Sequence, residues 1–425
     1  MRAGTADQRI EDVPKRLTVK GIPADPNLRI LATATLVNTF GNGALMTTFA
    51  LYFTRVVGLR PAQVALALSA GAFAGLVVQV PAGHLADLRG PRGVLQAFTF
   101  GASIAILGLL LARSVWALVA VMALFSLFDR GARAVLSGYV ARIAEGGQGV
   151  QFKAYLRAMT NVGISFGALL GGLALWVDQG WAYLGVFALD AATCAATAIW
   201  LGRLPQIAPA PPRRSGEPRM AVLHDLPFVV ITLLSGVSAM HFLVIELALP
   251  LWIAQETSAP RYLVAVTLMI NTVCVALLQV RLTRNIDLVG PSSRAMARSG
   301  YWIAGGFALI AFASGQPTWL AIVMLCAGAL VHVVGEMIGS GGQWGVQMGL
   351  APRERQGQYQ GFAGVGFSLS HMVAPTLVIL LCIEWGRPGW FVMGGVIALA
   401  SLLMVPASSW ALRSRARYGV LTHSG

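Results

Sequence analysis

The sequence predicts an all-α integral membrane protein with twelve transmembrane helices in two pseudo-symmetric six-helix bundles. Of its 425 residues, 56% are hydrophobic and only 11% are charged, whereas a soluble globular chain averages about a quarter charged residues. This composition cannot supply the polar surface of a water-soluble enzyme, and it excludes disorder. The apolar runs are long and unbroken, which favours helices over the alternating strands of a β-barrel.

The twelve helices are placed by apolar segments that follow one another along the chain. Each segment has roughly the 20 residues that a helix needs to cross the hydrocarbon core, and polar residues separate it from the next. We expect the spans at residues 28–53, 61–83, 94–112, 116–140, 153–177, 182–201, 226–252, 261–282, 293–313, 318–342, 357–382 and 390–410.

The basic residues predict the orientation in the membrane. The chain has 31 Lys and Arg against 17 Asp and Glu, a net charge of +14. These residues lie between apolar runs and form no single patch, so they indicate the positive-inside pattern and no nucleic-acid partner. In the outer loops of this arrangement only Arg55, Arg60, Arg113, Arg261 and Arg387 remain. We therefore expect a multi-pass plasma-membrane protein with both termini in the cytoplasm.

One change in composition divides the chain into halves. The segment RLPQIAPAPPRRSGEPRMAVLH is rich in Pro and Arg and separates six spans from six, as a cytoplasmic linker without a specific partner would. The polar N-terminal tail lacks the apolar core of a signal peptide. The expected organisation is an N-terminal tail (1–27), a first bundle (28–202), a linker (203–225), a second bundle (226–410) and a C-terminal tail (411–425).

An internal repeat supports the division into halves. Residues 79–91 read QVPAGHLADLRGP and residues 279–291 read QVRLTRNIDLVGP, with six identities and no gap. In a weaker match between the two halves of the sequence, Asp129 aligns with Glu336. Two parallel six-helix halves are typical of transporters, with the substrate site between the halves near the bilayer midplane.

The loop after the second span carries the most specific motif. From Gly83 to Arg92 it reads GHLADLRGPR. Gly90 and the proline after it favour a tight turn, and Asp87 at a helix end beside basic residues suits a charge-assisted latch. The alternative is a local N-cap with solvated charges.

This loop resembles the signature loop of the major facilitator superfamily, and the resemblance extends over residues 28–410. Gly83, Asp87, Gly90 and Arg92 match the pattern, while two usually basic positions are Leu and Pro here. The resemblance implies alternating access between two bundles, with the Asp87 loop closing the cytoplasmic gate.

A glycine motif in the fifth span resembles that of the superfamily's drug/H⁺ antiporters. Gly163, Gly167, Gly171 and Gly172 match, and Ala168 stands where those antiporters have proline. Glycines at i, i+4 and i+8 let a neighbouring helix approach closely. The resemblance implies an exporter's flexible packing seam, and the alternative is ordinary small-residue packing.

Ionisable residues inside the spans are candidates for function, because a buried charge is costly in a membrane. Asp129 and Arg133 are four residues apart and share a helix face. The superfamily usually has an arginine in this span, and its pattern does not decide between Arg130 and Arg133. With Glu336, Asp129 is our first choice for proton coupling, because both should face the central cavity.

Two further carboxylates complete the proton-coupling candidates. Glu246 lies toward the outer end of the seventh span and is the second choice, and Asp190 lies near the middle of the sixth. For Asp190 and Arg157 a satisfied structural pair is an equal alternative. A desolvated carboxylate can have its pKa raised toward neutral, so that it takes up a proton on one side and releases it on the other.

Polar residues of the first span are candidates for the substrate cavity. Asn38 and Asn42 share one helix face and can bond either substrate or a neighbouring helix. We interpret His241 and His332 as packed polar groups and not as a proton relay.

No catalytic, ATP-binding or metal-binding constellation is present, so neither enzymatic activity nor a cofactor is expected. The predicted function is secondary active transport by a monomer, as proton-coupled export of a small amphipathic compound. Uptake or facilitated diffusion of a metabolite is the alternative, and a non-transporting receptor on the same fold is a third hypothesis that the short tails disfavour.

Overall fold

The computed structural model describes residues 17–19, 22–143, 148–211, 220–284, 286, 288–415 and 417–418. Most of the predicted N-terminal tail, the centre of the linker, the end of the C-terminal tail and Asp287 of the repeat lie outside the described residues. Within the described ranges the protein is helical apart from one short antiparallel pair, β1 (Thr18–Val19) and β2 (Ile22–Pro23).

The first half of the chain forms one group of long helices. Proline stands in the first turn of α1, α2 and α3, where its fixed φ suits a helix start and its missing N–H costs nothing. The helices are α1 (Pro26–Leu51) with a π-helical turn (Tyr52–Val56), α2 (Pro61–Arg89), α3 (Pro91–Leu109), α4 (Val115–Ile143), α5 (Gln148–Val177) and α6 (Gly180–Leu201).

The second half repeats this arrangement after the linker and a single helical turn, α7 (Ala221–His224). Its first long segment runs from α8 (Leu226–Leu243) through a π-helical turn (Val244–Ala248) into α9 (Leu249–Glu256). The remaining helices are α10 (Leu263–Leu282), α11 (Val289–Phe312), α12 (Thr318–Leu350), α13 (Gln356–Val378) and α14 (Arg387–Arg413). A 3-10 turn (Arg353–Arg355) precedes α13, and a π-helical turn (Ile379–Glu384) follows it.

The predicted all-helical membrane fold is confirmed. Among the described residues, ten helices are long and apolar enough to cross a membrane. The two other long helices, α1 and α11, carry more polar residues: α1 presents Asn38 and Asn42, and α11 begins with serines and arginines. Several helices extend beyond their predicted apolar segments, as α2 does to Arg89 and α12 to Leu350, because helical bonding continues where hydropathy ends.

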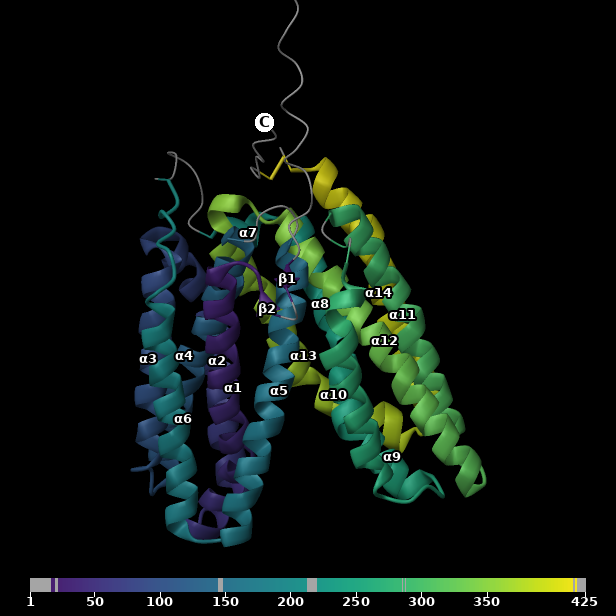
Figure 1. Ribbon diagram of the computed structural model, residues 1–425. Helices are drawn as coiled ribbons and strands as arrows, with labels where there is room; N and C mark the ends of the chain where they lie inside the picture. The colour runs from purple at the N-terminus through teal and green to yellow at the C-terminus, as the bar shows by residue number, and fades with distance from the viewer. Residues whose placement is uncertain are drawn as a thin grey trace, which may run out of the picture.

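The two groups of helices lean against each other at one end and diverge at the other (Figure 1). Their contacts run along α2 and α4 against α13, and along α5 against α10 and α12. The end where they meet carries α7 and the last turns of α14, and we call it the terminal end; the opposite end is the far end. Each group has its own apolar core, with Tyr52 and Phe187 in the first and Phe307 and Trp390 in the second.

Candidate transport site

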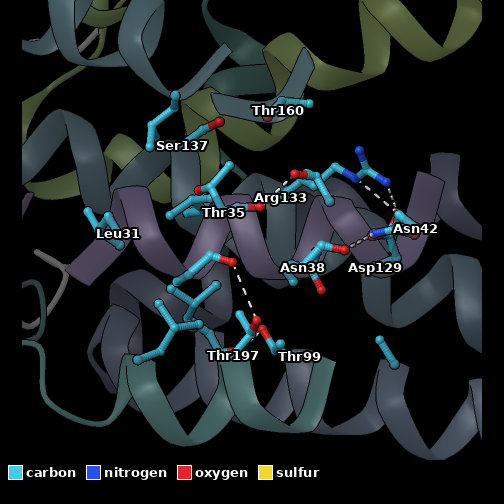
Figure 2. Close-up of a pocket in the computed structure, with 18 of the residues that line it drawn as sticks. Leu31, Thr35, Asn38, Asn42, Thr99, Asp129, Arg133, Ser137, Thr160 and Thr197 are labelled. Atoms are coloured by element: carbon cyan, nitrogen blue, oxygen red, sulfur yellow. Dashed lines mark hydrogen bonds and ion pairs between the residues drawn. The ribbon is translucent and has the colours of Figure 1, made fainter. Parts of the chain in front are cut away.

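A cavity of about 410 Å³ lies among α1, α3, α4, α5 and α6. Its walls combine apolar side chains with hydroxyl, amide and charged groups (Figure 2). The second group of helices contributes Trp344 alone to this lining. The cavity therefore lies mainly inside the first group, whereas the repeat led us to expect a site between the two halves. The polar lining residues are Thr35, Asn38, Thr39, Asn42, Thr99, Asp129, Arg133, Ser137, Lys153, Arg157, Thr160 and Thr197.

Helix α1 supplies the amide groups of the cavity. Asn38 and Asn42 both line it, and Asn42 Nδ2 donates to the Asn38 backbone oxygen at 3.2 Å. Figure 2 shows both residues on the same side of α1 as Thr35. Their spacing of one helical turn therefore brings two amide side chains to one wall.

Three glycines of α5 set the distance between α5 and α1. A Cβ at Gly163 would collide with Thr39, and one at Gly167 with the Phe40 carbonyl. At Gly171 it would lie 2.8 Å from Thr47 Cβ, whereas Gly172 has open space around it. Side-chain-free positions at i, i+4 and i+8 thus let α5 pack closely on the helix that carries the cavity amides.

Helix α4 contributes an ion pair to the cavity wall. Arg133 Nε and Nη2 donate to the same oxygen, Asp129 Oδ2, at 2.9 and 2.6 Å. The Arg133 side chain is 60% exposed and that of Asp129 is 13% exposed. Arg130 is not in the lining; its side chain packs toward Gly75 of α2. Of the two candidate arginines, Arg133 is the one that faces the cavity.

A second ion pair joins the two groups of helices. Arg157 of α5 lines the cavity and donates to Glu336 Oε1 and Ser340 Oγ of α12. Asn271 Nδ2 of α10 donates to the other oxygen, Glu336 Oε2, at 2.8 Å. The Glu336 side chain is only 3% exposed, so this buried carboxylate depends on a cation from the other half of the protein.

Two histidines extend this network toward α8. His332 Nδ1 lies 3.7 Å from Glu336 Oε2, and His332 Nε2 lies 3.1 Å from His241 Nδ1. The sequence predicts packed polar groups at both positions, and the structure buries both in a row with Glu336. The i, i+4 spacing of His332 and Glu336 was the available sequence signal, whereas no pattern connects His241 to them.

The same three residues have a spacing that metal ligands can use. Within the described residues, ligand atoms of His241, His332 and Glu336 all lie within 4.8 Å of one another. However, Glu336 already accepts from Arg157 and Asn271, and a guanidinium beside the carboxylate repels a divalent cation. The geometry is that of a hydrogen-bond network rather than a metal centre.

The two other candidate carboxylates lie in contrasting environments. Asp190 is fully buried, next to Gly41 of α1, and neither of its side-chain oxygens has a hydrogen-bond partner among the described residues. Glu246 is exposed and lies in the π-helical turn between α8 and α9. Neither lines the cavity.

At the terminal end, Asp87 of α2 fastens the first half to the second. Its Oδ1 accepts from the Gly357 N–H at 2.9 Å and its Oδ2 from the Gln358 N–H at 2.8 Å. Both amides belong to the first turn of α13, where unpaired N–H groups and the helix dipole favour an anion. The latch thus uses backbone donors, where we expected the neighbouring basic side chains.

The other motif residues shape the same contact. Gly83 has no room for a Cβ, because the Gly357 carbonyl occupies that space. Gly90 has φ +87° between α2 and α3, a conformation that favours glycine, and Arg92 is half-buried in the first turn of α3. Gln79 Nε2 also donates to Ser368 Oγ of α13 at 2.9 Å, so several polar contacts hold the terminal end closed.

Two groups of membrane helices, a polar cavity among them and hydrogen bonds that close one end define a membrane transporter. The family model of the Major Facilitator Superfamily matches residues 31–375. The chain belongs to this superfamily, and it is accordingly a multi-pass secondary transporter of a small molecule and not an enzyme. No curated protein matches the sequence.

Solved structures share the fold at low sequence identity. The human organic anion transporter MFSD10 (TETRAN) has 14% identity and a TM-score of 0.68, over 89% of this chain and 98% of its own. A bacterial homologue of the iron transporter ferroportin, in its outward-facing state, has 15% identity and a TM-score of 0.71, over 91% and 99%. The Escherichia coli fucose:proton symporter FucP has 13% identity and a TM-score of 0.66, over 90% and 98%. At these identities the likeness concerns the fold.

Proposed function

We propose that this protein is a proton-coupled exporter of a small amphipathic compound, acting as a monomer in the plasma membrane with both termini in the cytoplasm. The excess of basic residues in the segments predicted on the terminal side supports this orientation. Under this orientation the closed terminal end is the cytoplasmic gate, and the structure represents an outward-facing state.

The ion pair between Arg157 and Glu336 carries the proposal. Alternating access requires the two halves to part at the terminal end, and α5 then moves away from α12. Glu336 would lose the cation that balances its charge, and an unpaired ionised carboxylate in a membrane is strongly unfavourable. A proton on Glu336 removes that cost, so proton binding and opening of the gate favour each other.

The surroundings of Glu336 support the proposal with neighbouring titratable groups and with a link to the cavity. His332 on α12 and His241 on α8 lie next to it, Asn271 on α10 donates to it, and Arg157 on α5 is its charged partner. Because Arg157 also lines the cavity, a molecule bound there and a proton on Glu336 both act on the same guanidinium. Asp129, the other first-choice carboxylate, is paired within its own helix and does not change partner when the halves move.

Export is favoured by the glycine seam of α5. The antiporter-like glycines pack α5 on α1, and the same helix carries Arg157. A movement of α5 along this seam would change the cavity and the ion pair together. In this cycle a proton enters from outside, is released in the cytoplasm and exchanges for the substrate.

Two measurements test the proposal. In lipid nanodiscs, spin labels placed beyond α1 and beyond α9 report the separation of the far ends; we expect lowering the pH from 8 to 5.5 to bring them together as the terminal end opens. Glu336→Gln should adopt the low-pH distance at both pH values, whereas Glu256→Gln, at an exposed position at the end of α9, should respond like the wild type.

The second measurement is proton flux. In proteoliposomes with an acidic lumen and an internal pH dye, adding a transported amphipathic compound should dissipate the pH gradient, and Glu336→Gln should abolish the response. A pH-independent wild-type distance, or a Glu336→Gln variant that still moves protons, would contradict the assignment. A compound that moves in the same direction as the protons would show symport instead of antiport.

A further inference from the structure

The charges around the cavity do not balance. Three cations line it, Arg133, Lys153 and Arg157, together with one carboxylate, Asp129. Asp129 pairs with Arg133, and Glu336 pairs with Arg157 from the other half. Within the described residues, Lys153 has no carboxylate partner; its Nζ donates to the amide oxygen of Gln360 on α13 at 3.0 Å.

An ammonium group without a neutralising carboxylate is costly in a half-buried position. Lys153 is half-buried in the first turns of α5, and the residues on either side of it in the sequence belong to a predominantly apolar helix. A neutral amide oxygen satisfies one of its three donors but not its charge. A negatively charged ligand in the cavity would accept a hydrogen bond from the ammonium group and also neutralise its charge.

Arg133 retains capacity for a ligand. Its two bonds to Asp129 use Nε and Nη2 and reach a single carboxylate oxygen. Figure 2 shows two guanidinium nitrogens turned toward Asp129, with the third nitrogen directed away from it. With 60% of the side chain exposed, Nη1 is available as a donor to a ligand in the cavity.

The rest of the wall suits an apolar body. Phe125, Leu136 and Ile106 line the cavity from the first group of helices, and Trp344 does so from the second. A volume of about 410 Å³ falls within the range of sites for small organic ligands. Cationic, hydroxyl and amide groups together with apolar side chains in one lining match a molecule with one charged end and an apolar body.

We propose that the cavity binds a small amphipathic organic monoanion, with a carboxylate or sulfonate that pairs with Lys153 and an apolar body that packs against the apolar side chains of the lining. This names the substrate class for the transporter of the preceding section and rests on that function. The ligand's anionic group replaces the Gln360 oxygen at Lys153. Because Gln360 belongs to α13, ligand binding also releases one contact between the halves at the terminal end.

Matched probes test the charge preference directly. Purified full-length protein is titrated with 2-naphthoate, 2-naphthalenemethanol and 2-naphthalenemethylamine, which share one ring system and carry charges of −1, 0 and +1. A second series replaces naphthalene with phenyl and indole, and binding is measured by calorimetry and thermal shift. We expect the anion to bind at least about tenfold more tightly than its neutral and cationic counterparts.

Variants of Lys153 assign the preference to a residue. Lys153→Gln should weaken anion binding by about tenfold or more. Lys153→Arg keeps the charge and should retain anion binding. Gln360→Leu removes the resident partner of Lys153 and should leave anion binding equal or tighter. Monodispersity on size-exclusion chromatography checks the folding of each variant.

The proposal is wrong if the cationic or neutral probe binds as well as the anion, if no anion of the three series binds, or if Lys153→Gln keeps the full preference. Binding is measured without a pH gradient, so a failure of proton coupling would leave this result unchanged, and a failure here would leave the response of Glu336 to pH unchanged.

Discussion

Asp129 and Glu336 are aligned by the weaker sequence repeat between the two halves, but the structure gives them partners of different kinds. Asp129 pairs with Arg133 one turn along the same helix, at the wall of the cavity. Glu336 pairs with Arg157 from the other half, and its side chain is almost completely buried. The first pair can move as a unit with α4, whereas the second exists only while α5 and α12 are in contact.

A symmetric repeat predicts the same role for Asp129 and Glu336. The difference between their partners predicts different roles. A pair within one helix is not broken when the two halves separate. A pair between the halves makes the arrangement depend on the charge of either member. The asymmetry therefore predicts unequal effects of mutation, and three comparisons test it in order of decreasing size.

The largest effect is expected from Arg157→Leu. It leaves Glu336 buried without a cation, and breaking a buried ion pair from one side costs about 3–5 kcal/mol. Thermal unfolding in detergent should show a strongly lowered midpoint at pH 8. The double variant Arg157→Leu, Glu336→Leu should recover most of the loss, because no unpaired charge remains. A single variant as stable as the wild type would mean that the carboxylate is already neutral in this state.

A smaller effect is expected at the terminal latch. Asp87→Asn keeps one acceptor for the amides of Gly357 and Gln358 but removes the charge, and hydrogen bonds to a charged group contribute about 1.5–3 kcal/mol. The far-end spin labels should show more of the terminal-open population, by roughly tenfold in the equilibrium constant. Asp87→Glu should give an intermediate shift. An unchanged distance distribution would show that other contacts, such as Gln79 to Ser368, close this end.

The features that could be predicted from the sequence are those that depend on local spacing. Hydropathy places the helices because each must satisfy its own backbone in the membrane, and helix periodicity places Asp129 beside Arg133. The glycine spacing of α5 likewise predicts close packing, although it does not say that α1 is the partner. These features involve residues within a few turns of one another.

Contacts between distant segments were not accessible in this way. Arg157 and Glu336 are 179 residues apart in the sequence, and their pairing depends on how α5 meets α12. His241 meets His332 because α8 and α12 come together inside the second group. Lys153 is the cavity cation for which the described residues offer no carboxylate partner, and it stands near the start of a helix, where position alone suggests a solvated charge. Only the packed arrangement shows that it lines a cavity.

The smallest effect is expected from Asp129→Asn, and it is the sharpest test of the comparison. The pair with Arg133 is of the i, i+4 type and one member is well exposed, so its removal should lower stability by only about 0.3–0.5 kcal/mol. The far-end distance should keep the pH response of the wild type, because no contact between the halves is altered. Arg133, freed from Asp129, gains a donor for an anionic probe, so 2-naphthoate should bind equally or more tightly. If instead Asp129→Asn abolished the pH response while Glu336→Gln left it intact, the proton would be carried by the pair within α4, and the assignment to the pair between the halves would be reversed.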